Sequence, residues 1–207
     1  MNTLYYSPGA CSIGIRILLE EIGAPYETVL TSVREGAQLK PEYLAITPKA
    51  KVPALVRDDG SVLTEFPAIA WWLARSNPQA KLLPADVEGE ARALEAMDYV
   101  VATLHMQGFA RMFRPGNFAS DEAGQEAVKI RGREIVAKAL GILDTALAGR
   151  DYVAGEFSLA DAALFYVEFW ASVRVGLTLP ANLAAHFARM KARPAVAAAL
   201  AKEGLEA

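Results

Sequence analysis

The sequence predicts two domains of different class: an α/β domain with a mixed sheet in residues 1–76 and an all-α helical domain in residues 88–207. Three observations indicate this division. Short apolar runs alternate with helical patterns as far as residue 76, and strand patterns are absent after residue 87. Between these regions, prolines interrupt the periodicity of residues 77–87, which therefore predict the linker.

The first half of the α/β domain predicts a β-α-β unit. Thr3–Tyr6 has the pattern of a short strand, Ser12–Ile22 that of an amphipathic helix, and Tyr26–Leu30 that of a second strand. Gly23 and Pro25 separate the helix from the second strand. Such a unit requires parallel strands joined by a right-handed crossover.

The second half of this domain predicts a hairpin that runs into a helix. Ala54–Arg57 and Val62–Thr64 are apolar runs, and Asp59-Gly60 between them is a pair typical of tight turns. The helix covers Ala68–Ala74, and an irregular segment with a short helix near Glu42–Leu44 precedes the hairpin. A β-α-β unit followed by β-β-α is the thioredoxin-like order.

The second domain predicts helices throughout, and its richness in alanine favours close packing between them. The pattern of Leu159–Val175 is apolar around most of the helix circumference, so we expect this helix to form the core of the domain. The predicted helices are Glu88–Phe113, Glu122–Leu147, Leu159–Val175, Leu183–Lys191 and Ala195–Ala201.

Ser158 and Asp161 predict a capping box at the start of this central helix. The Ser158 hydroxyl can accept from the Asp161 N–H, and the Asp161 carboxylate can accept from the Ser158 N–H. Phe157 is placed to pack against the first turn. We expect a purely structural role, since losing such a cap typically costs about 1 kcal/mol.

The segment between Val52 and Glu65 has the features of a peptide-binding site. Pro53 begins a strand, where an X-Pro bond can be cis, and leaves the main-chain groups of Val52 free to pair with a peptide-like ligand. Glu65 offers a carboxylate to an amine, and the helix that it opens attracts an anion to its N-terminus. These groups suit a small zwitterionic peptide.

The composition is that of an ordinary soluble globular protein, with 53% hydrophobic and 22% charged residues. A net charge of −3 gives no reason to expect nucleic acid or an anionic membrane as a partner. No secretory-signal pattern is evident, and the longest apolar run, Phe66–Ala74, is too short to span a bilayer. One cysteine suits a reducing compartment, and with two distant histidines it cannot build a metal site. We expect a cytoplasmic protein without a metal.

The motifs, in this order, resemble the cytosolic glutathione S-transferases, and most closely their bacterial beta class. One such motif would be weak evidence, but the ordered set spans essentially the whole chain. The matching segments are Leu4–Ser12, Ile46–Lys49 before Val52-Pro53, Leu63–Glu65 and Phe157–Ala162.

The resemblance implies a homodimeric detoxification enzyme that conjugates the thiolate of its co-substrate, glutathione, to small apolar electrophiles. Main-chain groups of Val52 would bind the cysteinyl unit, and Glu65 with the Phe66 N–H would hold the γ-glutamyl end. Asp98 would reach the glutathione amine across the dimer interface. The implied binding residues are Ala10, Cys11, Lys49, Val52, Pro53, Glu65, Phe66, Asp98 and His105.

Three residues are expected to surround the glutathione sulfur: Cys11, Ser12 and His105. A cysteine at a helix N-terminus can have a lowered pKa and be reactive, although a lone cysteine can also be a small buried hydrophobe. Ser12 could instead donate a hydrogen bond to the thiolate, or be an ordinary helix residue. His105 is either a site residue or a solvent-facing or core histidine; α-helical spacing places it on one face with Asp98 and Phe109.

The sequence departs from the family pattern at three places that concern glutathione affinity. Phe66 stands where a small or hydroxylated residue often supports the γ-glutamyl carboxylate, and Met106 stands where the beta class has a lysine. The lysine that often binds the glycine end has no clear equivalent, although Arg34 or Lys49 could substitute.

The electrophile site and the reaction both leave alternatives open. Candidates for the apolar second site are Phe109, Met112, Phe113 and Trp170, which are equally credible as core residues. A second enzymatic function is glutathione-dependent thiol–disulfide exchange or peroxidase chemistry through Cys11. A third possibility is a non-catalytic protein that uses this fold for binding.

Overall fold

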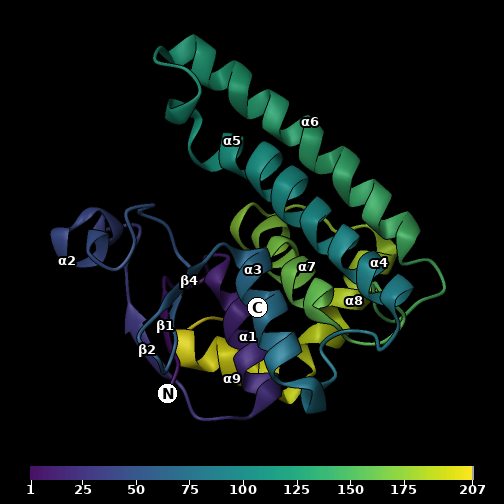
Figure 1. Cartoon of the computed structure of the whole chain (residues 1–207). Coiled ribbons are helices and arrows are strands. Elements are labelled where there is room, and N and C mark those ends of the chain that lie inside the picture. The colour runs from purple at the N-terminus through teal and green to yellow at the C-terminus, as the bar shows by residue number, and fades with distance from the viewer. Residues whose placement is uncertain (207) are drawn as a thin grey trace.

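The computed structural model describes residues 1–206 and shows a four-stranded sheet packed against helices (Figure 1). The strands are β1 (Thr3–Tyr6), β2 (Glu27–Leu30), β3 (Ala54–Val56) and β4 (Val62–Thr64), in the spatial order β2-β1-β3-β4. Strand β1 runs parallel to β2 and antiparallel to β3, which is antiparallel to β4. The predicted β-α-β unit, hairpin and mixed sheet are confirmed.

Helices α1 (Ser12–Ile22) and α3 (Phe66–Ser76) follow β1 and β4, and the short η1 (Ala37–Leu39) and α2 (Pro41–Leu44) lie in the irregular segment. Helix α1 is buried on more than the one side that its amphipathic pattern indicates, because α7 and α9 of the helical domain also pack on it. At Gly14 an added Cβ would lie 2.7 Å from the carbonyl oxygen of Ala162, so only glycine allows this close approach.

The helical domain contains two long antiparallel arms and a central helix (Figure 1). One arm is continuous from residue 87 to residue 113, and α6 packs along it. The elements that follow the sheet domain, from the linker to the end of the helical domain, are η2 (Pro78–Ala80), α4 (Val87–Asp98), η3 (Tyr99–Phe109), α5 (Ala110–Phe113), η4 (Pro115–Asn117), α6 (Glu122–Ala146), α7 (Leu159–Phe169), η5 (Trp170–Arg174), α8 (Ala181–Lys191) and α9 (Pro194–Glu203). Residue 207, the predicted end of this domain, lies outside the described residues.

Segment η3 is π-helical rather than α-helical. Because its turns are wider, residues spaced for an α-helix do not stay on one face. Asp98 is exposed, whereas Phe109 is fully buried. The predicted common face of Asp98, His105 and Phe109 is therefore wrong.

Helix α7 forms the centre of the helical domain, as predicted, and every one of its residues is buried. Its N-terminus carries the capping box of Ser158 and Asp161. The segment between the two domains is also fixed in place, because the Leu82 carbonyl accepts a 2.9 Å hydrogen bond from the Leu159 N–H. Among residues 1–206, none of the helices combines the length and apolar character needed to cross a bilayer.

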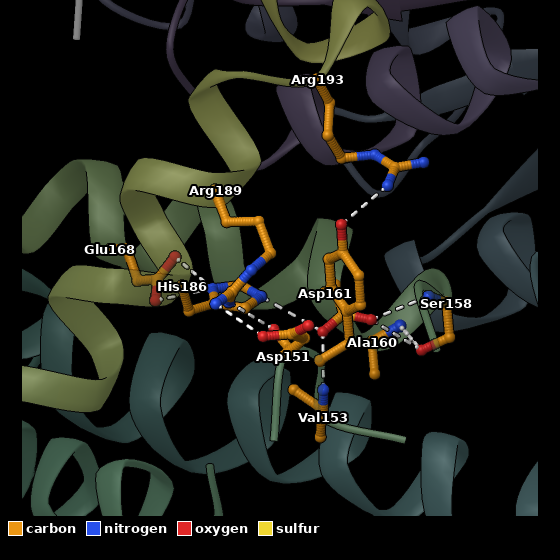
Figure 2. Close-up of polar contacts among 10 residues, drawn as sticks. Asp151, Val153, Ser158, Ala160, Asp161, Glu168, His186, Arg189 and Arg193 are labelled. Atoms are coloured by element: carbon orange, nitrogen blue, oxygen red, sulfur yellow. Dashed lines mark hydrogen bonds and ion pairs between the residues drawn. The ribbon is translucent and has the colours of Figure 1, made fainter. Parts of the chain in front are cut away.

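A buried charged triad links α7 to α8 (Figure 2). The His186 Nδ1 lies 2.9 Å from Glu168 Oε1, and its Nε2 lies 3.2 Å from Asp161 Oδ1. All three side chains are fully buried. Burial by itself lowers the pKa of His186, but Glu168 and Asp161 outweigh this and raise it to about 9, so at neutral pH the imidazole is charged and both ring nitrogens donate.

Asp161 therefore has two functions, one in the capping box and one in the triad. Its Oδ2 accepts from the Ser158 N–H at 2.8 Å, and its Oδ1 accepts from the Val153 N–H at 2.8 Å while facing His186 (Figure 2). The sequence shows no motif around His186, because its partners come from another helix.

Candidate active site

The loop between β1 and α1 positions Cys11 at the junction of the two domains. Gly9 has a φ of +61°, which favours glycine, and its carbonyl accepts a 2.8 Å hydrogen bond from Trp170 Nε1. Cys11 follows as the N-cap residue of α1, and its side chain is 9% exposed. The Cys11 thiol donates to the Val52 carbonyl over 3.5 Å. The cysteine and the main chain expected to bind peptide are thus neighbours.

The Val52-Pro53 peptide bond is cis, as the sequence allows, and it precedes β3. At the other end of the hairpin, Glu65 adopts the unusual backbone angles φ 68° and ψ 126°. Non-glycine residues in such conformations cluster at functional sites. The Glu65 carboxylate is more than half exposed, and Lys49 Nζ lies 2.9 Å from it and 2.8 Å from Thr64 Oγ1.

Two adjacent cavities meet beside Cys11. They have volumes of about 400 and 140 Å³, the larger being typical of small-molecule sites. The residues that line both are Cys11, Lys51, Val52, His105 and Met106. The smaller cavity continues to Lys49, Pro53, Glu65 and Phe66, and the larger one continues to Ala10, Gln38, Phe113, Arg114, Phe118, Trp170 and Arg174.

His105 lies on η3 against the aromatic rings of α7 and η5. Its Nδ1 is 3.2 Å from the Tyr166 hydroxyl, and its ring meets the edge of Trp170 at a centroid distance of 4.7 Å. Burial lowers the pKa of His105 to about 4, with a smaller effect from the charges of Arg114 and Lys51. The imidazole is therefore neutral at neutral pH.

The partner of His105 also determines which nitrogen carries the proton. Burial raises the pKa of Tyr166 well above its usual value, so its hydroxyl keeps the proton. Because this buried hydroxyl needs an acceptor and His105 Nδ1 is its hydrogen-bond partner, we assign Tyr166 as the donor. The proton of the neutral imidazole then resides on Nε2. His105 can thus donate a hydrogen bond from Nε2 to an anion in the cavity.

Burial raises the pKa of Cys11 to about 12, and this outweighs the lowering by main-chain N–H groups at the start of α1. The prediction of a lowered Cys11 pKa is therefore wrong. At neutral pH this residue is a thiol, which can donate a hydrogen bond but is a poor nucleophile. The sequence showed the helix N-terminus, but the burial comes from residues distant in the chain.

The other predicted site residues occupy different positions. Ser12 is fully buried, its hydroxyl exchanges 3.2 Å hydrogen bonds with the main chain of Ser7, and it lines neither cavity. Asp98 is exposed and also lines neither. Two residues were expected to bind the glycine end of glutathione. Of these, Lys49 lies at the Glu65 end of the smaller cavity and Arg34 lines neither cavity. The lysine that lines the larger cavity is Lys51.

Two of the four candidate electrophile residues, Phe113 and Trp170, line the larger cavity. Phe109 instead belongs to the core, where it is fully buried and stacks on Phe113. Met112 also lies outside the lining residues. Sequence reasoning missed Arg114 and Phe118; the only signal was their position at the helix break of Pro115-Gly116.

Two family models match the chain. Residues 9–76 match "Glutathione S-transferase, N-terminal domain", and residues 91–201 match "Glutathione S-transferase, C-terminal domain". The chain is 36% identical over 207 residues to glutathione S-transferase GstA of Escherichia coli O157:H7, and the match covers 98% of this chain and 99% of that relative.

Solved structures are similar over the same length. A glutathione transferase homologue from Sulfitobacter with bound glutathione has a TM-score of 0.91 and 33% identity, covering 100% of this chain and 99% of that one. A bacterial beta class glutathione S-transferase from Sphingomonas chungbukensis has a TM-score of 0.85 and 35% identity, covering 99% of this chain and 100% of that one.

Proposed function

Because this chain belongs to the glutathione S-transferase family, we propose that it binds glutathione across the two adjacent cavities and conjugates its sulfur to a small electrophile. The observation that carries this proposal is the meeting of the two cavities at Cys11, Val52 and His105, with Glu65 at the far end of the smaller cavity. A reacting sulfur beside Cys11 would then face the larger cavity, where the electrophile enters.

Glutathione would lie along the edge that leads from Glu65 past Val52. Main-chain groups of Val52 bind the cysteinyl unit, Glu65 binds the γ-glutamyl amine, and the Phe66 N–H at the start of α3 binds the γ-glutamyl carboxylate. Pro53, Ala10 and Lys49 complete the walls of this path. The glycine carboxylate would reach Lys51, which lines both cavities and supplies a positive charge there.

The sulfur would be held as a thiolate by neutral hydrogen-bond donors. His105 donates from Nε2, and the Cys11 thiol offers a second donor in place of its hydrogen bond to Val52. Donors of this kind lower the pKa of a bound thiol because they favour its charged form. Ser12 has no part in this mechanism, since its hydroxyl is bonded to Ser7.

The first test is binding of glutathione to a Glu65→Gln variant. The substitution keeps the shape of the side chain but removes the charge that faces the ammonium, so affinity should fall by about one to two decades. Calorimetry measures the change, and Glu88→Gln on the exposed surface of α4 is the matched control. Unchanged affinity in Glu65→Gln would place glutathione elsewhere.

Thiol–disulfide exchange through Cys11 is a second candidate function, favoured by the position of this only thiol between the cavities. With a pKa of about 12, the thiolate fraction is small at neutral pH. The rate of mixed-disulfide formation with oxidised glutathione should therefore rise about tenfold per pH unit between roughly pH 7 and 9. Intact-mass spectrometry measures the single adduct. A rate that is already constant near neutral pH would contradict the buried-thiol assignment and favour exchange as the main activity.

We also propose that the enzyme is a cytoplasmic homodimer. Exposed apolar side chains on the sheet domain, Val62 and Trp71, and on α6, Ile130 and Ile142, support an interface. Asp98 would then reach the glutathione site of the partner subunit. A monomer mass in light scattering at micromolar concentration would rule out the dimer and this role of Asp98.

A further inference from the structure

The charged residues that line the larger cavity are all positive. Three cationic residues line it, Lys51, Arg114 and Arg174, and no aspartate or glutamate is among its lining residues. The whole chain has the opposite balance, with 24 acidic and 21 basic residues. The positive character is therefore a property of this cavity and not of the composition.

The cationic side chains of the cavity differ in whether they already bind another group of the protein. Arg174 Nη2 donates a 3.0 Å hydrogen bond to the Pro8 carbonyl, so this side chain helps to fix the loop before Cys11. Among residues 1–206, Arg114 and Lys51 have no carboxylate within ion-pair distance. The field of Arg114 reaches the reacting end of the site, because it lowers the pKa values of both Cys11 and His105.

The two free cations lie on different walls. Lys51 precedes Val52 in the sheet domain, where the proposed function places the glycine end of glutathione. Arg114 follows Phe113 at the end of the long helical arm, and the aromatic residues Phe113, Phe118 and Trp170 line the same cavity. Phe113 and Phe118 are exposed, so this wall is open to an incoming molecule.

We propose that the second substrate is an organic anion: a planar, aromatic electrophile whose ring packs on Phe113, Phe118 and Trp170 and whose carboxylate is bound by Arg114. This inference rests on the proposed function and narrows its class of electrophile. A guanidinium suits this task because it can donate two parallel hydrogen bonds to one carboxylate. The open cavity also allows the positive field to attract the anion before contact.

A reaction that fits this site is aromatic substitution on a chlorinated dinitrobenzoate. The glutathione sulfur forms a bond to the ring carbon that carries chlorine, the carbon–chlorine bond breaks, and chloride leaves with the bonding electrons. The thiol proton is released to solvent. The carboxylate is neither formed nor broken in the reaction, but it withdraws electrons from the ring less strongly than an amide does. Each enzymatic rate is therefore divided by the rate at which the same electrophile reacts with glutathione without enzyme.

The test compares 4-chloro-3,5-dinitrobenzoate with its neutral amide, which has nearly the same shape. We expect kcat/KM, divided by the uncatalysed rate constant of the same electrophile, to be about twofold to fivefold higher for the carboxylate than for the amide at low salt, as for one solvent-accessible charge pair. Arg114→Gln should bring the ratio close to one, and added salt should reduce it. Arg150→Gln, which removes a charge outside the cavity, is the matched control and should keep the wild-type ratio.

A binding measurement keeps this inference separate from the proposed function. The unreactive 3,5-dinitrobenzoate and 3,5-dinitrobenzamide are titrated into wild type and Arg114→Gln by calorimetry. Tighter binding of the benzoate to wild type, lost in Arg114→Gln, supports the inference. Equal or weaker binding of the benzoate overturns it, even if the amide is conjugated normally. Failure to bind glutathione or to conjugate either electrophile overturns the proposed function, and the titration still decides the charge preference.

Discussion

His105 shows how one residue acquires its chemistry from its surroundings. The aromatic side chains of Tyr166 and Trp170 bury the imidazole, which lowers its pKa to about 4. The Tyr166 hydroxyl then fixes the tautomer by donating to Nδ1. A histidine that was charged at neutral pH would also attract a thiolate, but a neutral donor keeps its protonation state throughout the physiological range.

We expect His105→Phe to raise the pKa of the bound glutathione thiol by about one to two units, since a hydrogen bond to a charged group contributes about 1.5–3 kcal/mol. Tyr166→Phe should raise it less, because the donor remains and only its tautomer is no longer fixed. The ultraviolet absorbance of the thiolate, followed against pH, measures both shifts. An unchanged thiol pKa in His105→Phe would mean that another group stabilises the sulfur.

At the scale of elements, the buried triad explains how α8 is held against α7. His186 on α8 lies between Glu168 and Asp161, which are both on α7 (Figure 2). Burial by itself lowers the pKa of His186, but the charge of Glu168 and the hydrogen bonds to both carboxylates outweigh this and raise it to about 9. Burial raises the pKa of Glu168 to about 7, against the opposing charge of His186.

The triad gives stability a defined pH dependence. Because the native state binds the His186 proton more tightly than the unfolded chain, this contribution is complete below about pH 6.5 and is lost as the pH rises through about 9. The raised pKa of Glu168 acts in the same direction at lower pH. Urea unfolding should therefore show a decline in stability above neutral pH that is absent in His186→Gln.

His186→Gln should also lower the free energy of unfolding by about 3–5 kcal/mol, because it leaves two carboxylates buried without a cation. Adding Glu168→Gln should restore part of this loss by removing one of the charges. Arg150→Gln, at an exposed position outside the triad, is the control. If His186→Gln were no less stable than Arg150→Gln, the triad would not hold α7 and α8 together.

At the scale of the whole molecule, the C-terminal helix α9 supports the active-site loop from the other domain. The Glu203 carboxylate accepts a 3.0 Å hydrogen bond from Arg16 Nε on α1 and a 2.8 Å hydrogen bond from the Gly9 N–H. Both charged side chains are buried, and Arg16 also lies over the Tyr6 ring at 4.2 Å. The position of Cys11 therefore depends on the docking of the two domains.

Glu203→Gln should lower the free energy of unfolding by about 3–5 kcal/mol, since it leaves the Arg16 charge buried without its partner. Glutathione affinity should fall as well, because the Gly9 loop loses one of its supports. Urea unfolding and calorimetry measure the two effects, with Glu206→Gln on the exposed end of the chain as the control. Full stability together with reduced affinity would show that Glu203 supports the loop without holding the domains.

Features that depend on neighbours along the chain could be predicted from the sequence. These include the order of strands and helices, the capping box of Ser158 and Asp161, the Val52-Pro53 bond before β3 and the position of Glu65 at the start of α3. Periodicity, caps and turn residues act over a few positions, so each can be recognised without the fold. The π-helical form of η3 was missed, because its spacing is set by packing against α6 and α7.

The electrostatics of the site could not be predicted from the sequence, because they arise from the folded arrangement. The raised pKa of Cys11, the tautomer of His105 and the partners of His186 all depend on burial and on charges that belong to distant segments. The same holds for the larger cavity, which Lys51 and Arg114 line from different domains. The physical reason is that desolvation and Coulomb interactions act through space and have no signature in local sequence order.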